Sequence, residues 1–173
     1  MKKSMILLSV GKDRPGIVDD VSSFLFEQGA NIEDSRMAAL GGCFSIMTLF
    51  SCNPDQAETI KGALDNLGKL GLESYIYEAD PTVKKREAGK SLKMDVRAMD
   101  HPGIVQKLVH VLRLHDVNIL SLNTHVSKAP LSGAPLFALE LEADAPSEVS
   151  IDRLKEELKG VAAQRNLDIN FRD

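Results

Sequence analysis

The sequence contains no tryptophan, only two cysteines and only two tyrosines among its 173 residues. Two cysteines cannot form the multi-bridge framework of a small secreted scaffold, so the disulfide-rich class is excluded. No apolar run reaches the roughly 20 residues that a membrane-spanning helix needs. The first residues also lack the apolar stretch of about 7 to 15 residues typical of a secretory signal. We therefore expect a cytoplasmic protein with no membrane partner.

An excess of positive charge is also lacking, since 21 lysines and arginines face 25 aspartates and glutamates. The net charge is −5 over residues 1–80, +3 over residues 81–91 and −2 over residues 92–173. Sequence-independent affinity for nucleic acids comes from Lys and Arg side chains at phosphates. The two acidic segments therefore predict no direct nucleic-acid binding. The basic stretch 81–91 is interpreted as a solvated linker, with a contact patch as the alternative.

What the sequence does contain is an internal repeat. The segment Asp13–Val18 (DRPGIV) recurs as Asp100–Val105 (DHPGIV), 87 residues later. The same offset carries Asn31–Ile32 onto Asn118–Ile119, so the match extends without a gap. A repeat of this length predicts two similar domains.

Both copies show the same order of secondary-structure signals. Each begins with a strand-like run, Ser4–Val10 or Ser91–Met99, and each continues with a helix that Pro15 or Pro102 opens in its first turn. Gly29 is expected just after the end of the first helix. The remaining expected elements are strands 31–40, 43–52, 72–78, 117–126, 135–143 and 166–172, and helices 55–69 and 150–164.

This order, βαββαβ twice, predicts an α+β protein made of two ferredoxin-like domains in tandem. Each would be an antiparallel sheet with helices on one face. The first domain is predicted at residues 1–80, the linker at 81–91 and the second domain at 92–173. Because helices cover only one sheet face, a second copy or a second subunit should cover the other face or extend the sheet edge, and we expect the two copies to pair. We also expect a homo-oligomer, most simply a dimer.

Several apolar side chains are predicted to be buried. Helical spacing places Val18 on the core face of the first helix, with Val21 and Leu25. The sulfur-containing residues expected in the interior are Cys43, Cys52, Met37, Met47, Met94 and Met99.

The Asp-x-Pro-Gly-Ile-Val motif after a strand, followed by Asn-Ile about fifteen residues later, resembles the ACT domain in both copies. Two ACT repeats without another domain are similar to the glycine cleavage system transcriptional repressor group. The resemblance implies regulatory modules that bind small molecules, usually amino acids, at interfaces between paired domains. Matched to the family pattern, the implied ligand-binding residues are Asp13, Arg14, Pro15, Gly16, Ile17, Asn31 and Ile32, and in the second copy Asp100, His101, Pro102, Gly103, Ile104, Asn118 and Ile119.

The chemistry of these residues agrees with such a ligand. The N-terminus of a helix offers unpaired N–H groups and a positive dipole end, which suit a carboxylate. Asp13 and Asp100 can face an ammonium group, and Asn31 and Asn118 offer a donor and an acceptor each. The alternative is structural, because Pro-Gly is common turn chemistry and Asp and Asn often cap local backbone. Arg14 against His101 distinguishes the copies.

Catalysis and metal binding receive little support from the sequence. The four histidines, His101, His110, His115 and His125, have no i, i+4 His partner or HExxH context, so we expect no metal. No nucleophile elbow, P-loop or dinucleotide-binding motif occurs, so we expect neither a cofactor nor an enzyme. ACT domains also accompany catalytic domains in folate deformylases and nucleotidyltransferase-type proteins, but the two copies and the linker occupy this chain.

The sequence thus predicts a non-catalytic regulator that binds a small amino acid and signals to a protein partner, a transcription factor or an enzyme. Control of glycine metabolism is implied only by the resemblance to the repressor group. The alternative is a protein-interaction module that acts without any ligand.

Overall fold

The computed structural model describes residues 2–79, 89–130 and 132–172. These residues form two compact units, on either side of residues 80–88. Most of the predicted linker, 81–91, therefore lies outside the described residues and stays a prediction, although a strand already begins at Lys90. None of the described helices is long and apolar enough to cross a bilayer.

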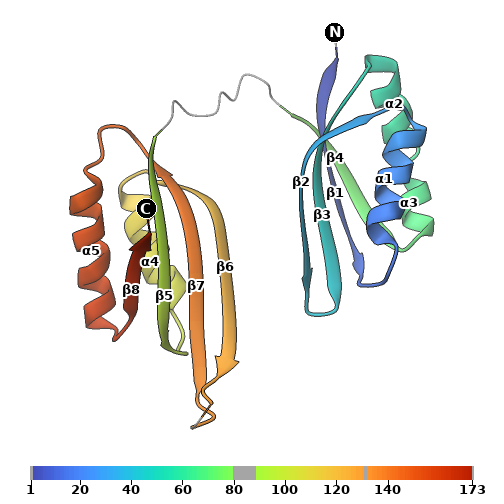
Figure 1. Cartoon of the computed structure of the whole chain (residues 1–173). Coiled ribbons are helices and arrows are strands. Elements are labelled where there is room, and N and C mark those ends of the chain that lie inside the picture. Colours follow the sequence, from blue (N-terminus) through green and yellow to red (C-terminus); the bar gives the residue numbers. More distant parts are fainter. Residues whose placement is uncertain (1, 80–88, 131, 173) are drawn as a thin grey trace. The chain divides into compact units, whose positions relative to one another are not determined.

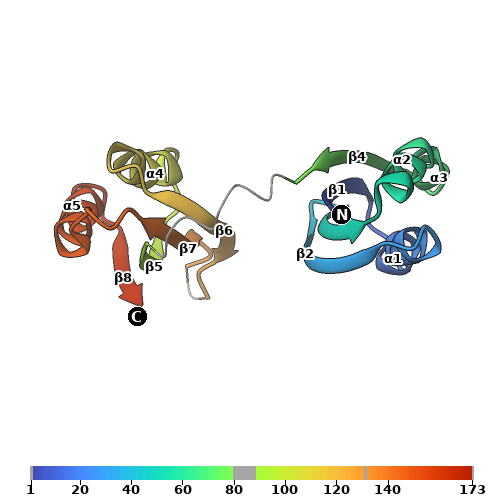
Figure 2. The same cartoon turned by 90° about the horizontal axis from the view of Figure 1, so that it is seen from above.

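The first unit is a four-stranded antiparallel sheet in the order β2-β3-β1-β4. Its helices all lie on one side of the sheet (Figures 1 and 2). Since β1 and β2 are both antiparallel to the strand between them, they run in the same direction. The elements are β1 (Lys3–Lys12), α1 (Ile17–Glu27), β2 (Asn31–Leu40), β3 (Cys43–Cys52), α2 (Pro54–Gly62), α3 (Asp65–Lys69) and β4 (Leu72–Glu78).

The second unit repeats this topology, with the strand order β6-β7-β5-β8 and again antiparallel neighbours. The predicted fold class, two ferredoxin-like βαββαβ units, is confirmed. The elements are β5 (Lys90–Met99), α4 (Ile104–Leu114), β6 (Asn118–Lys128), β7 (Pro135–Ala145), α5 (Ile151–Gln164) and β8 (Asp168–Arg172).

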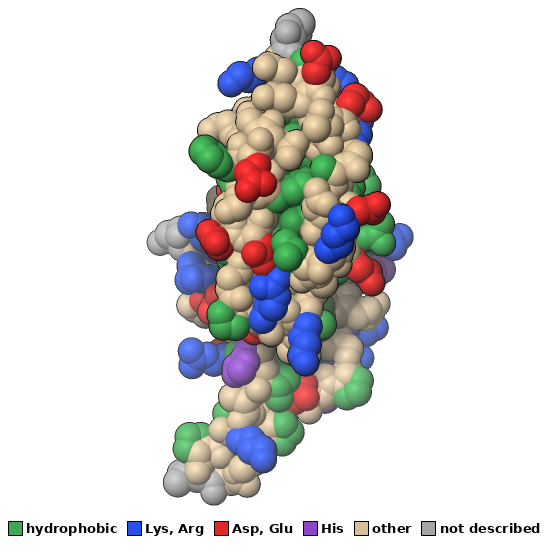
Figure 3. All heavy atoms as spheres, turned by 90° about the vertical axis from the view of Figure 1, so that its right-hand side faces the viewer, with side chains coloured by type: hydrophobic (Ala, Val, Ile, Leu, Met, Phe, Trp, Pro, Cys, Tyr) green, Lys and Arg blue, Asp and Glu red, His purple; other side chains and the backbone are tan. Residues whose placement is uncertain are grey.

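Each core lies between the sheet and its single layer of helices. On β1, alternate residues Met5 and Leu7 are buried toward the helices, as the two-residue period of a strand requires. Met94 and Val96 take the same role on β5. The helix side of the first unit shows interspersed acidic and basic side chains (Figure 3).

The prediction of a single helix over residues 55–69 was wrong, because the chain forms two helices, α2 and α3, with a break at Ala63–Leu64. The break follows Gly62, a weak helix former, and is closed by short i to i+3 bonds: the Asn66 N–H donates to the Ala63 carbonyl at 2.9 Å.

The two prolines predicted in the first helical turn lie just before it. Pro15 and Pro102 belong to the preceding turns, because Gly16 and Gly103 are the N-caps of the helices.

Some residues predicted to be buried are exposed. Val18 is 43% exposed, because the core face of α1 is rotated onto Ile17, Val21, Phe24 and Leu25. Met94 and Cys52 are buried as expected. Met37, Met47, Met99 and Cys43 are exposed, since they lie on an edge strand, on the sheet face away from the helices or at strand ends.

Candidate functional site

The predicted ligand-binding turns join the first strand of each unit to its first helix. Gly16 and Gly103 adopt the left-handed backbone, with φ of 91° and 92°, which glycine accepts without strain. No side chain caps the N-terminus of α1 or α4. Both helices therefore keep first-turn N–H groups that a bound anion could accept.

The backbone of each turn is tied to the opposite hairpin. The Asp13 N–H donates to the Gly42 carbonyl at 2.9 Å, and the Asp100 N–H donates to the Pro135 carbonyl at 3.0 Å. Both carboxylates remain exposed. The turn geometry is thus fixed by backbone bonds, which leaves the aspartate side chains available for another partner.

Arg14 and His101 give the two turns different surroundings. The Arg14 Nη2 donates to Asp20 Oδ2 at 2.6 Å and to the Leu70 carbonyl at 3.0 Å, so its guanidinium lies beside the start of α1. In the second unit the His101 Nδ1 lies 3.2 Å from the Pro102 carbonyl oxygen. The first turn therefore has an arginine where the second has a histidine, and the first turn of α4 carries Lys107 where α1 carries Asp20.

The asparagines lie far from these turns within their own units. Asn31 pairs with Ser51, and Ser51 pairs with Ser4 at the beginning of β1. Asp13 instead follows the end of β1. At about 3.3 Å per residue, the two side chains are separated by roughly 25–30 Å along the sheet.

The second unit has the same separation. Asn118 pairs with Asp144, which pairs with Ser91 at the beginning of β5, whereas Asp100 follows its end. Each unit therefore carries two distinct groups of predicted residues. We name them the turn cluster (Asp13–Ile17 or Asp100–Ile104) and the strand cluster (Asn31 with Ile32, or Asn118 with Ile119).

A β-bulge immediately follows each strand cluster. The register shifts between Ile32 and Asp34 on β2 and between Ile119 and Ser121 on β6, so Glu33 and Leu120 are the extra residues. These positions are equivalent in the repeat. A bulge bends an edge strand and changes the direction of its side chains. Here the pairing register of the strand cluster therefore differs from that of the residues that follow it on β2 and β6.

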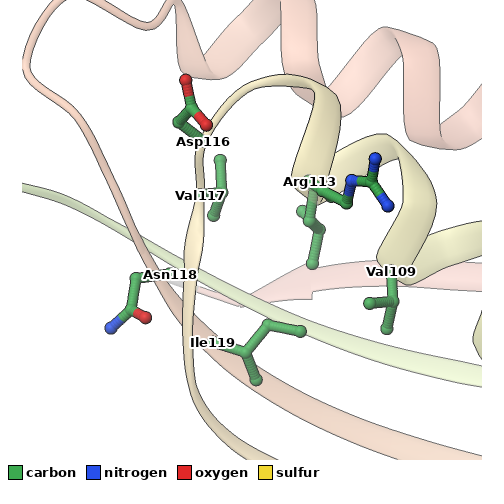
Figure 4. A pocket seen from close by; sticks show the side chains of 7 residues that line it. Val109, Arg113, Asp116, Val117, Asn118 and Ile119 are labelled. Carbon is green, nitrogen blue, oxygen red and sulfur yellow. The ribbon is translucent and has the colours of Figure 1, made fainter.

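The strand cluster of the second unit borders a hollow of about 240 Å³ at the end of α4 (Figure 4). Asn118 and Ile119 point to opposite sides of the strand, Ile119 toward the helix. Two charged residues that the sequence analysis did not single out, Arg113 and Asp116, also line the hollow. The only sequence signal for them is the charge difference from the first copy, where Phe26 and Gly29 take their places.

The titratable groups whose pKa is clearly shifted lie outside the turn and strand clusters. The pKa of Glu157 is lowered mainly by a hydrogen bond from His115, and burial raises the pKa of the Cys52 thiol. Within the residues that the structure describes, no three His, Cys, Asp or Glu side chains gather as a metal site would require.

Comparison with known proteins agrees with this architecture. Residues 4–73 match the model of the ACT domain. The glycine cleavage system transcriptional repressor of Escherichia coli is 25% identical over 163 residues, which cover 94% of this chain and 85% of the repressor. The UPF0237 protein MK1213 of Methanopyrus kandleri is 38% identical over 69 residues, 39% of this chain and 74% of that protein.

A solved structure extends the likeness to both units. The crystal structure of an unknown protein from Galdieria sulphuraria is 29% identical, with a TM-score of 0.88 over 99% of this chain and 98% of that chain. The same βαββαβ topology occurs in both units here. The chain therefore belongs to the ACT domain family and is a tandem ACT-domain protein.

Proposed function

We propose that this protein is a non-catalytic regulator that binds a small amino acid between paired ACT units and passes the signal to a protein partner. The similarity to the Escherichia coli glycine cleavage system transcriptional repressor, across 94% of the chain, supports a regulatory role in the cytoplasm. By the same similarity, the process controlled is transcription in glycine metabolism, and the partner is a transcription factor or an enzyme.

The observation that carries the proposal is the separation of the turn and strand clusters. A small amino acid is much shorter than the roughly 25–30 Å between Asp13 and Asn31. One unit alone therefore cannot offer both clusters to one ligand. Two units placed side by side in opposite directions bring the turn cluster of one to the strand cluster of the other, and two-fold symmetry produces two such positions.

The chemistry at such a junction matches a zwitterion. The unpaired N–H groups and the positive dipole end of α1 or α4 take the carboxylate. The aspartate of the turn takes the ammonium group, and the asparagine carboxamide can bond either end. Such a ligand stabilises the paired arrangement over others, and that difference is what a partner protein can detect.

The strand clusters are not equivalent. Arg113 and Asp116 place opposite charges around the hollow next to Asn118. In the first unit the same positions hold Phe26, 80% exposed, and Gly29, neither of which carries charge. We therefore expect the position that includes Asn118 to bind more tightly.

A thermal-shift screen of free amino acids against the full chain tests the proposal. A ligand should raise the melting temperature with concentration, as RT ln(1 + [L]/Kd). Asn118→Ala should raise the Kd of the ligand about tenfold, the loss expected for a hydrogen bond to a charged group. Asn123→Ala is the matched control, because Asn123 is an exposed asparagine further along β6. No response to any amino acid, or an equal loss in both variants, contradicts the proposal.

A further inference from the structure

The sheet of the first unit has one face without helices, and the centre of that face is apolar. Charged residues lie at its edges, Asp34 and Arg36 on β2 and Glu73 on β4. On β1, Ile6, Leu8 and Val10 point away from the helices because Met5 and Leu7 point toward them. The neighbouring strands add Met47 and Leu49 on β3 and Tyr75 and Tyr77 on β4, through the register. We name this set the apolar face: Ile6, Leu8, Val10, Met47, Leu49, Tyr75 and Tyr77.

The apolar face is accessible within its unit. Met47 is 48% exposed, Tyr75 is 54% exposed and Tyr77 is 55% exposed. A hollow of about 140 Å³ lies between Ile6, Met47, Leu49 and the β2 residues Asp34 to Arg36. A contiguous apolar patch of this kind marks an interaction surface, whereas single exposed apolar residues need no explanation.

The second unit shows that the fold does not require this apolar character. Its helix-free face has a charged or polar residue at every equivalent place in the register. Asp95 replaces Leu8 and forms an ion pair with Arg172 at 2.9 Å. The seven equivalents are Lys93, Asp95, Arg97, Glu140, Glu142, Asn170 and Arg172.

This charged face is an unsuitable cover for the apolar face. Burying Lys93, Glu140 or Glu142 against aliphatic side chains would remove their hydration without supplying partners, which is costly for every charge buried. A suitable cover must instead be apolar opposite the side chains of the two central strands, β1 and β3.

We infer that the apolar face binds the apolar face of a second copy of this chain. A two-fold axis along the strands lays β2 of one copy over β4 of the other, because these are the outer strands of the sheet. Arg36 of β2, whose side chain is 72% exposed and forms an ion pair with Asp34, then lies over Tyr75 of the second copy, at the same level of the register. Arginine stacks well on aromatic rings. One face thus carries both halves of the contact, as a self-complementary interface requires.

The size of the sheet limits such a dimer to a small interface. Four strands about 4.8 Å apart, paired over about seven residues, give a flat footprint of about 400 Å². This is about half of the roughly 800 Å² per partner of a standard interface, so we expect a dimer of only moderate affinity. The two sheets would pack about 10 Å apart, as in a β-sandwich.

Sedimentation equilibrium of the full chain without amino acids tests the inference. The wild type should dimerise at micromolar concentration. The double variant Ile6→Lys with Leu8→Asp should weaken dimerisation at least 100-fold, because it installs the residues of the second unit at the same positions, where the fold accepts them. Arg36→Ala should weaken it about tenfold, from the lost stacking on tyrosine. Circular dichroism melts check that the variants stay folded. If the double variant does not fold, Arg36→Ala still tests the interface.

Two controls separate this interface from others. Glu142→Lys changes the charged face of the second unit and should leave the dimer unchanged, since that face is not used. Asn31→Ala with Asn118→Ala should also leave it unchanged, because the proposed amino-acid site is separate. A monomeric wild type, a dimer that survives Ile6→Lys with Leu8→Asp, or a dimer that Glu142→Lys dissociates would overturn the inference without deciding the amino-acid site.

Discussion

Gly29 and Asp116 occupy the same place in the two units, one residue beyond the C-caps of α1 and α4, and both have a left-handed backbone, with φ of 72° and 52°. The following N–H groups close the helix ends: Ala30 donates to the Leu25 carbonyl and Val117 to the Leu112 carbonyl, each at 3.0 Å. Glycine takes this conformation freely, whereas an L-residue is strained by about 1 kcal/mol or more.

Asp116→Gly should therefore stabilise the second unit by about 1 kcal/mol, measured by urea denaturation. The same variant removes a charge from the hollow beside Asn118, so we also expect weaker amino-acid binding. A lower stability of Asp116→Gly would contradict the assignment of strain to this position.

Alanine substitutions at two glycines should have opposite signs. Gly29→Ala should destabilise the first unit by about 1 kcal/mol, because alanine is strained in the left-handed backbone conformation and its methyl group would clash with the side-chain amide of Gln56. Gly160→Ala in the middle of α5 should stabilise by about 0.5–1 kcal/mol, since a Cβ there meets nothing. Equal effects in urea denaturation would contradict this.

The two cysteines should differ in reactivity. Cys43 is exposed, whereas Cys52 is 2% exposed and burial raises the pKa of its thiol, which lowers the reactive thiolate fraction. Iodoacetamide at about pH 8 should modify Cys43 first and Cys52 only after denaturation. Mass spectrometry of tryptic peptides measures both rates, and comparable rates would show that Cys52 is not protected.

The contact between α4 and α5 should respond to pH. The His115 Nε2 lies 2.8 Å from Glu157 Oε2, and this hydrogen bond lowers the pKa of Glu157. A carboxylate whose pKa is lowered by folding stabilises the folded state at pH values above its ordinary pKa. That stabilisation is lost as the pH falls through the lowered pKa. Glu157→Gln should thus reduce the melting temperature at pH 7, with a difference that shrinks below about pH 4.

The matched control for this pH effect is Glu156→Gln. Glu156 forms an exposed i, i+3 ion pair with Lys159 on α5, so its removal should change the melting temperature little. A difference between wild type and Glu157→Gln that stays constant from pH 7 to pH 3 would contradict the role of this carboxylate.

The fold could be predicted from the sequence because its signals are local and occur twice. The Gly41-Gly42 turn has φ of 60° and 81° at both residues and joins β2 to β3 as a tight hairpin. Gly29 ends α1, and alternation of apolar residues located the strands. The break between α2 and α3 was not predicted, since an amphipathic pattern runs through it and only a tertiary fit decides where the turn opens.

The candidate site could be predicted only in part. The motif singled out the turn and the asparagine as candidates, but it did not show whether one ligand could reach both, and the register places Asp13 and Asn31 at opposite ends of the sheet. Arg113 and Asp116 were missed because they look like ordinary polar residues at a helix end. The exposure of Met47 was missed because apolar residues on a helix-free face have the same pattern as a core.

The central claim is that one amino acid lies between the turn cluster of one ACT unit and the strand cluster of another. The most direct test is a crystal structure of the full chain with the amino acid that gives the largest thermal shift. We predict ligand density in contact with first-turn N–H groups of α1 or α4 on one side and with Asn118 or Asn31 of a different unit on the other. Density contacting residues of a single unit only would contradict the account.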